Sequence, residues 1–502
     1  MDRKKIIYIG LILILTVMVS ITYFSYAFFT HKSEQHGKLN IVAGSLNYKM
    51  ESLKLDNNNQ VVVPSGMTYR FDIKITSLNE INSKYELYYA TNNNDISVNY
   101  TSLSIDNPRG TIAANSTKTV SIRVNNESNS DATVTFGVVG GFVNNELALN
   151  DINHIYALCD NETTFCISTT EQLINLANEV NSGDSKSGKI YYLENDLDLG
   201  GKFDSEGNML EGSTNWIPIG SYNNGIPFSG TFDGDGHIIR KLYINTSEMS
   251  PALFGYIRDG VIRKIGIEDS YIKGDSNPSS AIVRLLGRST MEQCYSKATV
   301  VGGKGSAGLA SNSSTQSVIK NCYNGGSVTG TTQFAAGILG YNSYSNLVRS
   351  YNFGNINSSG TESGGLVGGN SGTIKNTYNI GSVSDVKFGA GISGQLYKDG
   401  KIKNSYSSGV LSPKSGGIVG IISNQSGEEL LDNFYLNTTA EYGIYQSTNP
   451  DFQSKSNTGT TPISASEMPS ILSVINGDNV FVEDTLNINN GNPILKWELQ
   501  YR

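Results

Sequence analysis

Tyrosines recur in the second half of the chain at a nearly constant interval. Successive members of the series are 28, 28, 27, 28 and 29 residues apart. A period this regular is typical of repeat proteins, in which units stack and each unit contacts only its neighbours. We therefore treat six tyrosines as equivalent positions of successive units: Tyr295, Tyr323, Tyr351, Tyr378, Tyr406 and Tyr435.

Three other positions share this period. Aliphatic residues stand four positions before the tyrosine from the second unit on: Ile319, Leu347, Ile374, Ile402 and Leu431. Long or amide side chains stand two positions before it: Gln293, Asn321, Arg349, Asn376, Asn404 and Asn433. Glycines that precede an aliphatic residue open the units: Gly308, Gly337, Gly365, Gly391 and Gly417. Each unit therefore offers apolar, polar, aromatic and glycine positions to a regular stack.

The composition of the units indicates what kind of repeat they form. Glycine makes up 54 of the 502 residues, and β-branched residues stand singly between turns, which favours a parallel β-solenoid over helical repeats. Equivalent residues of such a fold lie about 4.8 Å apart. We predict a β-solenoid over residues 226–440, with aliphatic residues inside, stacked tyrosine rings, and amides hydrogen-bonded between coils. The glycines would supply either a positive φ or room for close backbone approach.

The repeat resembles a known family. The stretch Gly364–Tyr378, with the sequence GGLVGGNSGTIKNTY, looks like the GLUG repeat of bacterial surface and adhesin-like proteins. Residues 228–237 resemble a segment that opens such arrays, whereas Arg284 and Arg288 depart from the glycine pattern. The resemblance covers roughly residues 165–437. It implies an extracellular β-solenoid with a role in attachment, and it implies no catalytic residue.

The first thirty residues indicate export. Three basic residues precede the uncharged segment 6–29, whose 24 residues would span roughly 36 Å as a helix, enough to cross a bilayer. Residues 1–30 are therefore either a retained transmembrane anchor or a signal peptide cleaved after Ala27. In both cases the rest of the chain lies outside the cytoplasm, because the basic flank stays inside.

Residues 31–150 carry short strand-like runs between turn formers. The run Tyr69–Ile75 alternates apolar and polar residues, which is the period of a half-buried strand. Asparagine-rich turns at residues 92–95 and 125–126 separate such runs. We predict an immunoglobulin-like β-sandwich for this segment.

Residues 157–225 are predicted to hold a helical N-cap and the first strands of the solenoid. Ser168 and Glu171 have the spacing of a capping box, and a helical apolar face follows at Leu173, Leu176, Ala177 and Val180. A first strand is expected at residues 190–193. Cys159 and Cys166 stand seven residues apart, and outside the cytoplasm a disulfide between them is plausible.

Residues 441–502 are predicted to form a linker, a short helix and a cap strand that seals the far end. Ser464 and Glu467 have the spacing of a second capping box. Residues 492–497 are apolar and end on Trp497, which suits a final strand. Terminal repeats must differ from internal ones because they close the core.

The sequence offers few residues for catalysis or metal binding. Glu362 is the one carboxylate between residues 293 and 384. The pair Asp233 and Asp235 has the spacing of a calcium loop but lacks the later ligands, which favours a tight turn. The four histidines, His31, His36, His154 and His237, have no ligand spacing. We therefore predict no catalytic residue, cofactor or metal site, and a protein that is not an enzyme.

The net charge of the chain limits the classes of molecule that it is expected to bind. The net charge is −8, and no long basic run occurs, which argues against nucleic-acid binding. Lys320, Lys375 and Lys403 repeat one slot, with Val348 between them, and form either a solvated face or a basic stripe that meets acidic glycans.

Three functions remain open on these grounds. The first is a bacterial cell-surface or secreted protein, held in the membrane by residues 6–29 unless cleaved, whose solenoid flank binds glycans or proteins of host or neighbouring cells. The second is a structural spacer in the envelope without a specific ligand. The third is a polysaccharide-degrading β-helix enzyme.

Overall fold

The structure is a computed structural model that describes residues 46–143, 153–159, 161–247, 251–423, 426–477 and 479–500. The chain divides into two compact units, Met1–Asp160 and Asn161–Arg502. The predicted membrane segment 6–29 and the cleavage site at Ala27 lie outside the described residues. Within the described ranges, no helix has the length and apolar character needed to cross a bilayer.

The first unit consists of two sheets that share one hydrophobic core. The alternation predicted for residues 69–75 is confirmed, because Ile73 and Ile75 are buried whereas Asp72 and Lys74 are exposed. One sheet has the order β1 (Tyr48–Glu51), β3 (Thr68–Ser77), β7 (Thr117–Asn126), β5 (Ile96–Tyr100) and β10 (Tyr156–Ala157). The other has the order β2 (Gln60–Val63), β8 (Ala132–Phe142), β4 (Ser83–Thr91) and β6 (Arg109–Ile112), with β9 (Asn153–His154) on β4.

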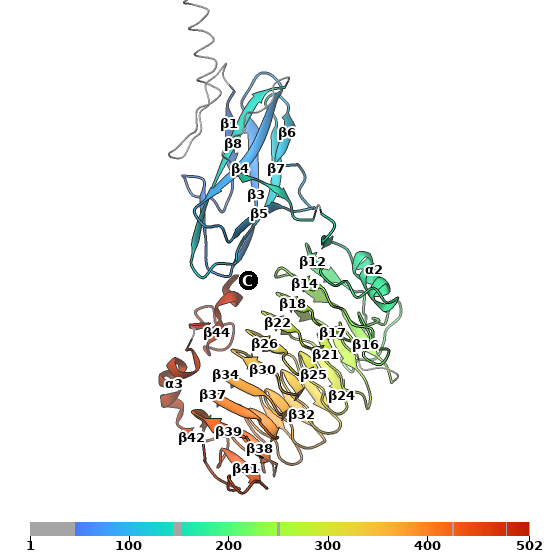
Figure 1. The fold of residues 1–502 in the computed structure, drawn as a ribbon, viewed down its shortest axis with the longest axis vertical. Coiled ribbons are helices and arrows are strands. Elements are labelled where there is room, and N and C mark those ends of the chain that lie inside the picture. Colours follow the sequence, from blue (N-terminus) through green and yellow to red (C-terminus); the bar gives the residue numbers. More distant parts are fainter. Residues whose placement is uncertain are drawn as a thin grey trace, which may run out of the picture. The chain divides into compact units, whose positions relative to one another are not determined.

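The second unit is a parallel β-solenoid, and Figure 1 shows its coils in succession. Three sheets build its walls, and we name them by their size. The eight-stranded sheet comprises β17 (Ile257–Arg258), β21 (Val283–Gly287), β25 (Ala310–Ser314), β29 (Leu339–Asn342), β33 (Val367–Asn370), β36 (Ser393–Leu396), β38 (Val419–Ile422) and β41 (Ile444–Ser447). The six-stranded sheet comprises β16 (Tyr243–Asn245), β20 (Tyr271–Lys273), β24 (Thr299–Gly302), β28 (Val328–Gly330), β32 (Ile356–Ser358) and β35 (Val383–Ser384).

The third wall is an eighteen-stranded sheet with two strand positions in most coils. Its first half comprises β11 (Thr164–Ile167), β12 (Ile190–Leu193), β13 (Leu197–Asp198), β14 (Thr231–Asp233), β15 (Ile238–Arg240), β18 (Val261–Arg263), β19 (Gly266–Glu268), β22 (Thr290–Glu292) and β23 (Tyr295–Ser296). Its second half comprises β26 (Val318–Lys320), β27 (Tyr323–Asn324), β30 (Asn346–Val348), β31 (Tyr351–Asn352), β34 (Thr373–Asn379), β37 (Lys401–Ser407), β39 (Glu429–Leu431), β40 (Asn433–Leu436) and β42 (Thr460–Ile463). The sheet therefore extends beyond residues 226–440 at both ends.

The predicted tyrosine column is confirmed in five of its positions, from Tyr295 to Tyr406. Neighbouring rings stack with centroids 4.7 to 5.2 Å apart. The sixth position is wrong by one residue, because Phe434 pairs with Tyr406 and Tyr435 pairs with Ser407. Adjacent strand residues face opposite sides of a sheet, so the Tyr435 ring lies in the solenoid core.

The same shift affects the other predicted columns in this coil. Leu430, and not Leu431, pairs with Ile402 in the aliphatic column, and the Leu431 side chain is exposed. The interval from Tyr406 to its true counterpart, Phe434, is thus 28 residues. The 29-residue spacing arises from counting to Tyr435 in place of the adjacent Phe434. The buried aliphatic column otherwise agrees with the prediction. It continues into earlier coils of the solenoid through Met291 and Ile262.

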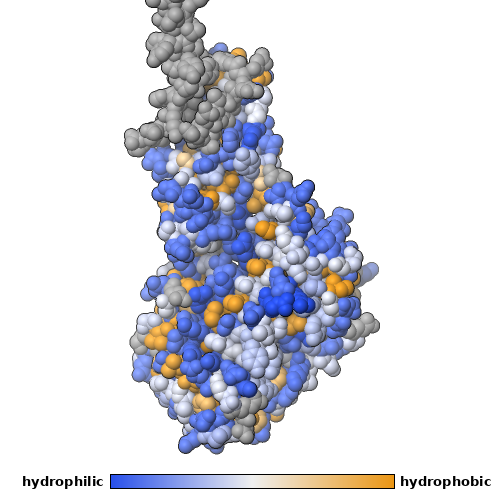
Figure 2. Space-filling view, viewed as in Figure 1, coloured by the Kyte–Doolittle hydropathy of each residue, from blue (hydrophilic) through white to orange (hydrophobic). Residues whose placement is uncertain are grey.

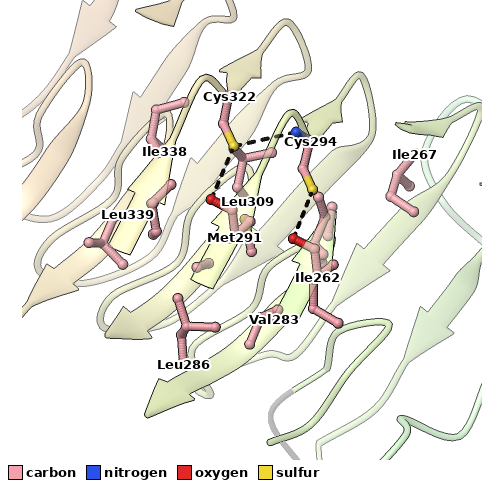
Figure 3. Close-up of a cluster of buried hydrophobic side chains, with 14 of the residues drawn as sticks. Ile262, Ile267, Val283, Leu286, Met291, Cys294, Leu309, Cys322, Ile338 and Leu339 are labelled. Atoms are coloured by element: carbon pink, nitrogen blue, oxygen red, sulfur yellow. Dashed lines mark hydrogen bonds between the residues drawn. The ribbon is translucent and has the colours of Figure 1, made fainter. Parts of the chain in front are cut away.

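Figure 3 shows the interior between these walls, where Cys294 and Cys322 lie in one column. Both cysteines are free and buried. The amide of Cys294 donates to Sγ of Cys322 at 3.4 Å, and the Cys294 thiol donates to the carbonyl oxygen of Ile262 at 3.7 Å. The two thiols therefore act as packed core residues that also satisfy backbone groups.

The solenoid uses its repeated glycines for close approach and not for a positive φ. A Cβ on Gly308 would lie 2.3 Å from the carbonyl oxygen of Gly337 and 2.3 Å from Oδ1 of Asn324. The left-handed corner is instead formed by larger residues, whose φ values lie between 46° and 56°. These residues are Lys264, Gln293, Asn321, Arg349, Asn376, Asn404 and Asp432.

Buried asparagines form a ladder one residue after the tyrosines. Nδ2 of Asn324 donates to Oδ1 of Asn352 at 2.8 Å, and Nδ2 of Asn352 donates to Oδ1 of Asn379 at 2.8 Å. The predicted amide column makes a similar bond, in which Nδ2 of Asn404 donates to Oδ1 of Asn376 at 3.1 Å. The buried ladder was missed, although an asparagine follows three successive tyrosines of the repeat.

At the N-terminal end, the helix α2 (Thr170–Asn181) covers the first coils with the predicted buried face. Its capping box is one residue later than predicted, because Thr169 and Gln172 form it. The Ser168 hydroxyl donates to the carboxylate of Glu194 at 3.1 Å instead, so it is not free to cap.

The C-terminal segment differs most from its prediction. It contains η1 (Ala465–Glu467), α3 (Met468–Ile475), β43 (Phe481–Val482), β44 (Ile494–Leu495) and η2 (Lys496–Gln500). The capping box of Ser464 and Glu467 is present. The segment does not seal the end of the core, however. It returns along the flank beside β37 and β34, as Figure 1 shows.

Candidate ligand-binding flank of the solenoid

The tyrosine column is closed to ligands by the C-terminal segment. Trp497 stacks on Tyr323 with ring centroids 5.8 Å apart, and its indole N–H donates to the carbonyl oxygen of Asn321 at 2.9 Å. Phe481 packs on Tyr378 at 5.5 Å. One hydrophobic cluster joins the column to this segment, and its tyrosines from Tyr323 to Tyr406 are buried.

Polar contacts hold the same segment in place. The Tyr351 hydroxyl donates to the carboxylate of Glu498, and Nδ2 of Asn489 donates to the Tyr378 hydroxyl at 2.9 Å. Burial raises the pKa of Tyr351 and Tyr378 well above the ordinary value. The stacked tyrosines therefore serve as an internal structural element.

The repeated lysines do not form a continuous basic stripe. Nζ of Lys320 lies 2.9 Å from a carboxylate oxygen of Glu292, and Nζ of Lys403 lies 2.7 Å from one of Glu429. Val348 interrupts the column, and Lys375 is exposed, so two of the three lysines are neutralised within the chain. This arrangement corresponds to the solvated-face interpretation.

Asp233 and Asp235 form a tight turn. Oδ1 of Asp233 accepts the amide of Asp235 at 2.8 Å, and its Oδ2 lies 2.7 Å from Nε of Arg263. Both carboxylates are buried, and Asp235 has a φ of 49°. The Asp233 carboxylate is therefore committed to the turn and to its ion pair.

The two described histidines each contact a carboxylate, and they lie in different units. Nδ1 of His154 is 2.7 Å from Glu86 in the first unit, and Nδ1 of His237 is 3.3 Å from Asp196 in the second. His31 and His36 lie outside the described residues. Across the described ranges, no group of three or more His, Cys, Asp or Glu side chains is placed to hold a metal ion.

The cysteines fall into two classes. Cys159 and Cys166 are both disulfide-bonded, whereas Cys294 and Cys322 are free. The linkage of Cys159 to Cys166 stays a prediction, which chemical mapping can test.

An aromatic group lies over the eight-stranded sheet. Phe334, Tyr341 and Tyr397 contact one another with ring centroids 5.8 to 6.2 Å apart, and we call them the aromatic cluster. Tyr341 pairs across the sheet with Gly369, where a Cβ would lie 2.7 Å from the Tyr341 ring and 3.2 Å from the Tyr397 ring. The glycine therefore makes room for both rings over β33.

The cluster is half-open to solvent. Phe334 is buried beneath it, whereas Tyr341 and Tyr397 are partly exposed. Burial raises the pKa of Tyr397 to about 12, and Tyr341 and Glu362 add to this effect. Partly exposed rings that keep their hydroxyl groups protonated can contact apolar faces and hydrogen-bond with hydroxyl groups at the same time.

Glu362 lies near Tyr397 of the aromatic cluster, and the Asp385 carboxylate of the next coil lies near Glu362. Oε2 of Glu362 accepts from Nε2 of Gln333 at 2.8 Å. Asp385 accepts the amides of Ser363 and Lys387 at 2.9 and 2.6 Å. Burial raises the pKa of Asp385, and the charge of Glu362 contributes. The repeat brings the two together because their coils are adjacent, a relationship that a search within residues 293–384 could not find.

On the face drawn in Figure 2, hydrophobic residues are scattered among hydrophilic ones. The eight-stranded sheet with its aromatic cluster is thus the candidate ligand-binding flank. It defines the second unit as a β-solenoid with a half-open aromatic site on one wall.

Comparisons with known proteins give no family for the chain. No family model matches, and no curated protein matches. Among solved structures, an IgA1 protease is 14% identical over 82% of this chain, with a TM-score of 0.38, and the match spans 29% of that protein. The catalytic domain of a GH87 alpha-1,3-glucanase in complex with nigerose is 11% identical over 86% of this chain and 95% of its own, with a TM-score of 0.21. The Agl-KA catalytic domain is 11% identical over 83% of this chain and 94% of its own, with a TM-score of 0.19.

Proposed function

We propose that the chain is an exported surface protein of a bacterium that binds glycans through the eight-stranded sheet of its solenoid. Residues 6–29 would anchor it in the membrane, or would be removed after Ala27. The first unit, with two sheets around one core, would be an immunoglobulin-like domain between the anchor and the solenoid. The resemblance to GLUG repeats supports a role in attachment.

One observation carries the choice of flank. The tyrosine column is covered by the chain's own C-terminal segment, whereas Tyr341 and Tyr397 remain partly exposed over β33. Sugar rings present apolar faces edged by hydroxyl groups, and aromatic side chains with polar neighbours complement such faces. Gln395, which pairs with Gly369 in the same sheet, supplies an amide at this place.

A glycan array tests this function on the full chain. The wild-type chain is expected to bind a defined set of glycans, and a Tyr341→Ala/Tyr397→Ala variant is expected to bind them at least tenfold more weakly. Tyr344→Ala is the matched control, because that side chain is 51% exposed and lies outside the aromatic cluster. Equal binding by all three chains would overturn the assignment of the flank, and a wild-type chain that binds no glycan would favour the spacer role.

A second candidate function rests on Glu362 and Asp385. Polysaccharide hydrolases use two carboxyl groups, one of them with a raised pKa, and here burial and the nearby Glu362 raise the pKa of the Asp385 carboxyl. This candidate predicts hydrolysis of a polysaccharide that disappears in Glu362→Gln and Asp385→Asn variants. Absence of turnover across a broad polysaccharide panel would remove it.

Location is tested separately. Cell fractionation with N-terminal sequencing of the exported chain is expected to find it in the membrane with residues 1–30 present, or in the medium with a new N-terminus at residue 28. Recovery from the cytoplasm would contradict the proposal.

A further inference from the structure

Arg284 occupies a position of the eight-stranded sheet at which the later coils have small residues. It lies on β21 between Val283 and Leu285, whose partners on β25 are Ala310 and Asn312. The register therefore aligns Arg284 with Ser311 and then with the glycines of later coils: Gly340, Gly368, Gly394 and Gly420. A long cation thus replaces small residues at one coil of an otherwise regular wall.

The guanidinium is half-buried and has no anionic partner among the described residues. Its Nε is buried and has no hydrogen-bond partner, and no carboxylate of the described residues lies within ion-pair distance. Burial accordingly lowers the pKa of Arg284. A buried donor without a partner costs about 1–3 kcal/mol, and charged groups cost more, so such a group in a native structure needs an explanation.

The side chains around the Arg284 guanidinium include an aromatic ring and an amide, the residue types that bind sugars. The guanidinium lies 5.4 Å from the ring centroid of Tyr222, which is 50% exposed and contacts Tyr256 edge to face at 5.7 Å. With its amide turned to donate to the carbonyl oxygen of Ser311 at 2.7 Å, Asn312 accepts from Nη1 of Arg284 at 3.1 Å. An exposed ring, an amide and a cation without an anionic partner among the described residues therefore meet at one point.

We propose that Arg284, with Tyr222 and Asn312, binds the carboxylate of an acidic sugar residue, such as a uronic acid or a sialic acid. Arginine donors match a carboxylate in a bidentate arrangement, and a carboxylate would give the guanidinium the anionic partner that the described residues do not supply. The Tyr222 ring would contact the sugar ring that carries the carboxylate.

This inference rests on the proposed function and sharpens it. Asn312 pairs with Tyr341 across the eight-stranded sheet, so the Arg284 site and the aromatic cluster lie on one wall. Arg284 and Tyr341 are two coils apart, a rise of about 10 Å. A linear glycan along this wall would reach both, with its acidic residue at Arg284 and a neutral residue at Tyr341. Sugar rings, with apolar faces edged by hydroxyl groups, complement partly exposed tyrosines, which favours a glycan.

Paired probes test the site on the full chain. An oligogalacturonate and the same oligosaccharide with its carboxyl groups reduced to alcohols differ only in the group that Arg284 would bind. The wild-type chain is expected to bind the acidic form at least tenfold more tightly. Arg284→Gln is expected to lose this preference, while Arg284→Lys keeps part of it. Arg288→Gln is the matched control, because that exposed arginine already pairs with Asp259 at 2.6 Å.

The outcomes separate this inference from the proposed function. Equal binding of both probes by the wild-type chain, or a preference that survives in a folded Arg284→Gln variant, would overturn the Arg284 site alone. A preference that Arg284→Gln removes, with binding that Tyr341→Ala/Tyr397→Ala leaves unchanged, would support the Arg284 site and remove the aromatic cluster. Tighter binding of a polyglutamate peptide than of either oligosaccharide would reassign the site to acidic peptides. Circular dichroism of each variant establishes that it is folded.

Discussion

The hydroxyl of Tyr351 donates to both carboxylate oxygens of Glu498, at 2.8 and 3.0 Å, although 147 residues separate the two in sequence. Oε1 of Glu498 also accepts the amide of Leu495 at 2.8 Å. This buried carboxylate thereby ties the last part of the chain to the middle of the solenoid. It explains why the tyrosine flank is structural and leaves the eight-stranded sheet as the flank for ligands.

Glu498→Gln is expected to lower the free energy of unfolding by about 2 kcal/mol, because hydrogen bonds to a buried charged group contribute about 1.5–3 kcal/mol. Urea unfolding followed by circular dichroism measures the change. Glu483→Gln, in the same segment but exposed, is expected to change stability by less than about 0.5 kcal/mol. Equal effects of the two substitutions would show that the Tyr351 contact is not formed.

Alkaline solution is expected to unfold the solenoid. Burial raises the pKa of Tyr351, Tyr378 and Tyr406 above the ordinary value of 10.0. Above about pH 10 the unfolded chain binds fewer protons than the folded chain, so the free energy of unfolding falls as the pH rises. Tyrosinate absorbance should therefore develop together with the loss of β-sheet signal. Complete ionisation near pH 10 in a chain that stays folded would contradict the buried column.

Asn352→Ala is expected to destabilise the solenoid by about 2–4 kcal/mol, because it removes bonds to Asn324 and Asn379 and leaves buried polar groups without partners. Thermal unfolding of the purified chain measures the loss. Asn357→Ala is the control in the next strand, since that side chain is exposed. If Asn352→Ala is as stable as the control, the asparagine ladder does not contribute to the free energy of unfolding.

Cysteine chemistry should divide the four cysteines into two pairs. Cys294 and Cys322 are fully buried, and burial raises the pKa of Cys322, so alkylation of both is expected only after unfolding. Peptide mapping without reductant is expected to recover Cys159 linked to Cys166. Rapid alkylation of Cys322 in the native chain, or alkylation of Cys159 without reduction, would contradict this division.

The sequence predicted the columns and missed the contacts that cross them. The constant interval placed Tyr295 to Tyr406 correctly, because the register of a solenoid is set by local period alone. It erred at Tyr435, where an adjacent Phe434 satisfies the same period. The contact of Trp497 with Tyr323 could not be predicted, because no local pattern encodes a partner 174 residues away.

In the candidate site, too, the sequence indicated some residues but not the contacts that they make. Arg284 was recognisable as a departure from the glycine pattern, but that no described residue gives it an anionic partner is a property of the packed wall. Tyr341 and Tyr397 belong to no predicted column, since they lie in parts of the coil where the repeat varies. The pairing of Glu362 with Asp385 likewise depends on two adjacent coils. Variable positions on a regular scaffold carry the distinctive chemistry of such proteins.

Hydrogen exchange with and without a bound glycan tests most directly which flank binds. We predict slower exchange in peptides that cover β29, β33 and β36 when the glycan is present, and unchanged exchange in those that cover β27, β31 and the C-terminal helix α3. Slower exchange confined to β27, β31 and α3, with none over β33, would contradict the account.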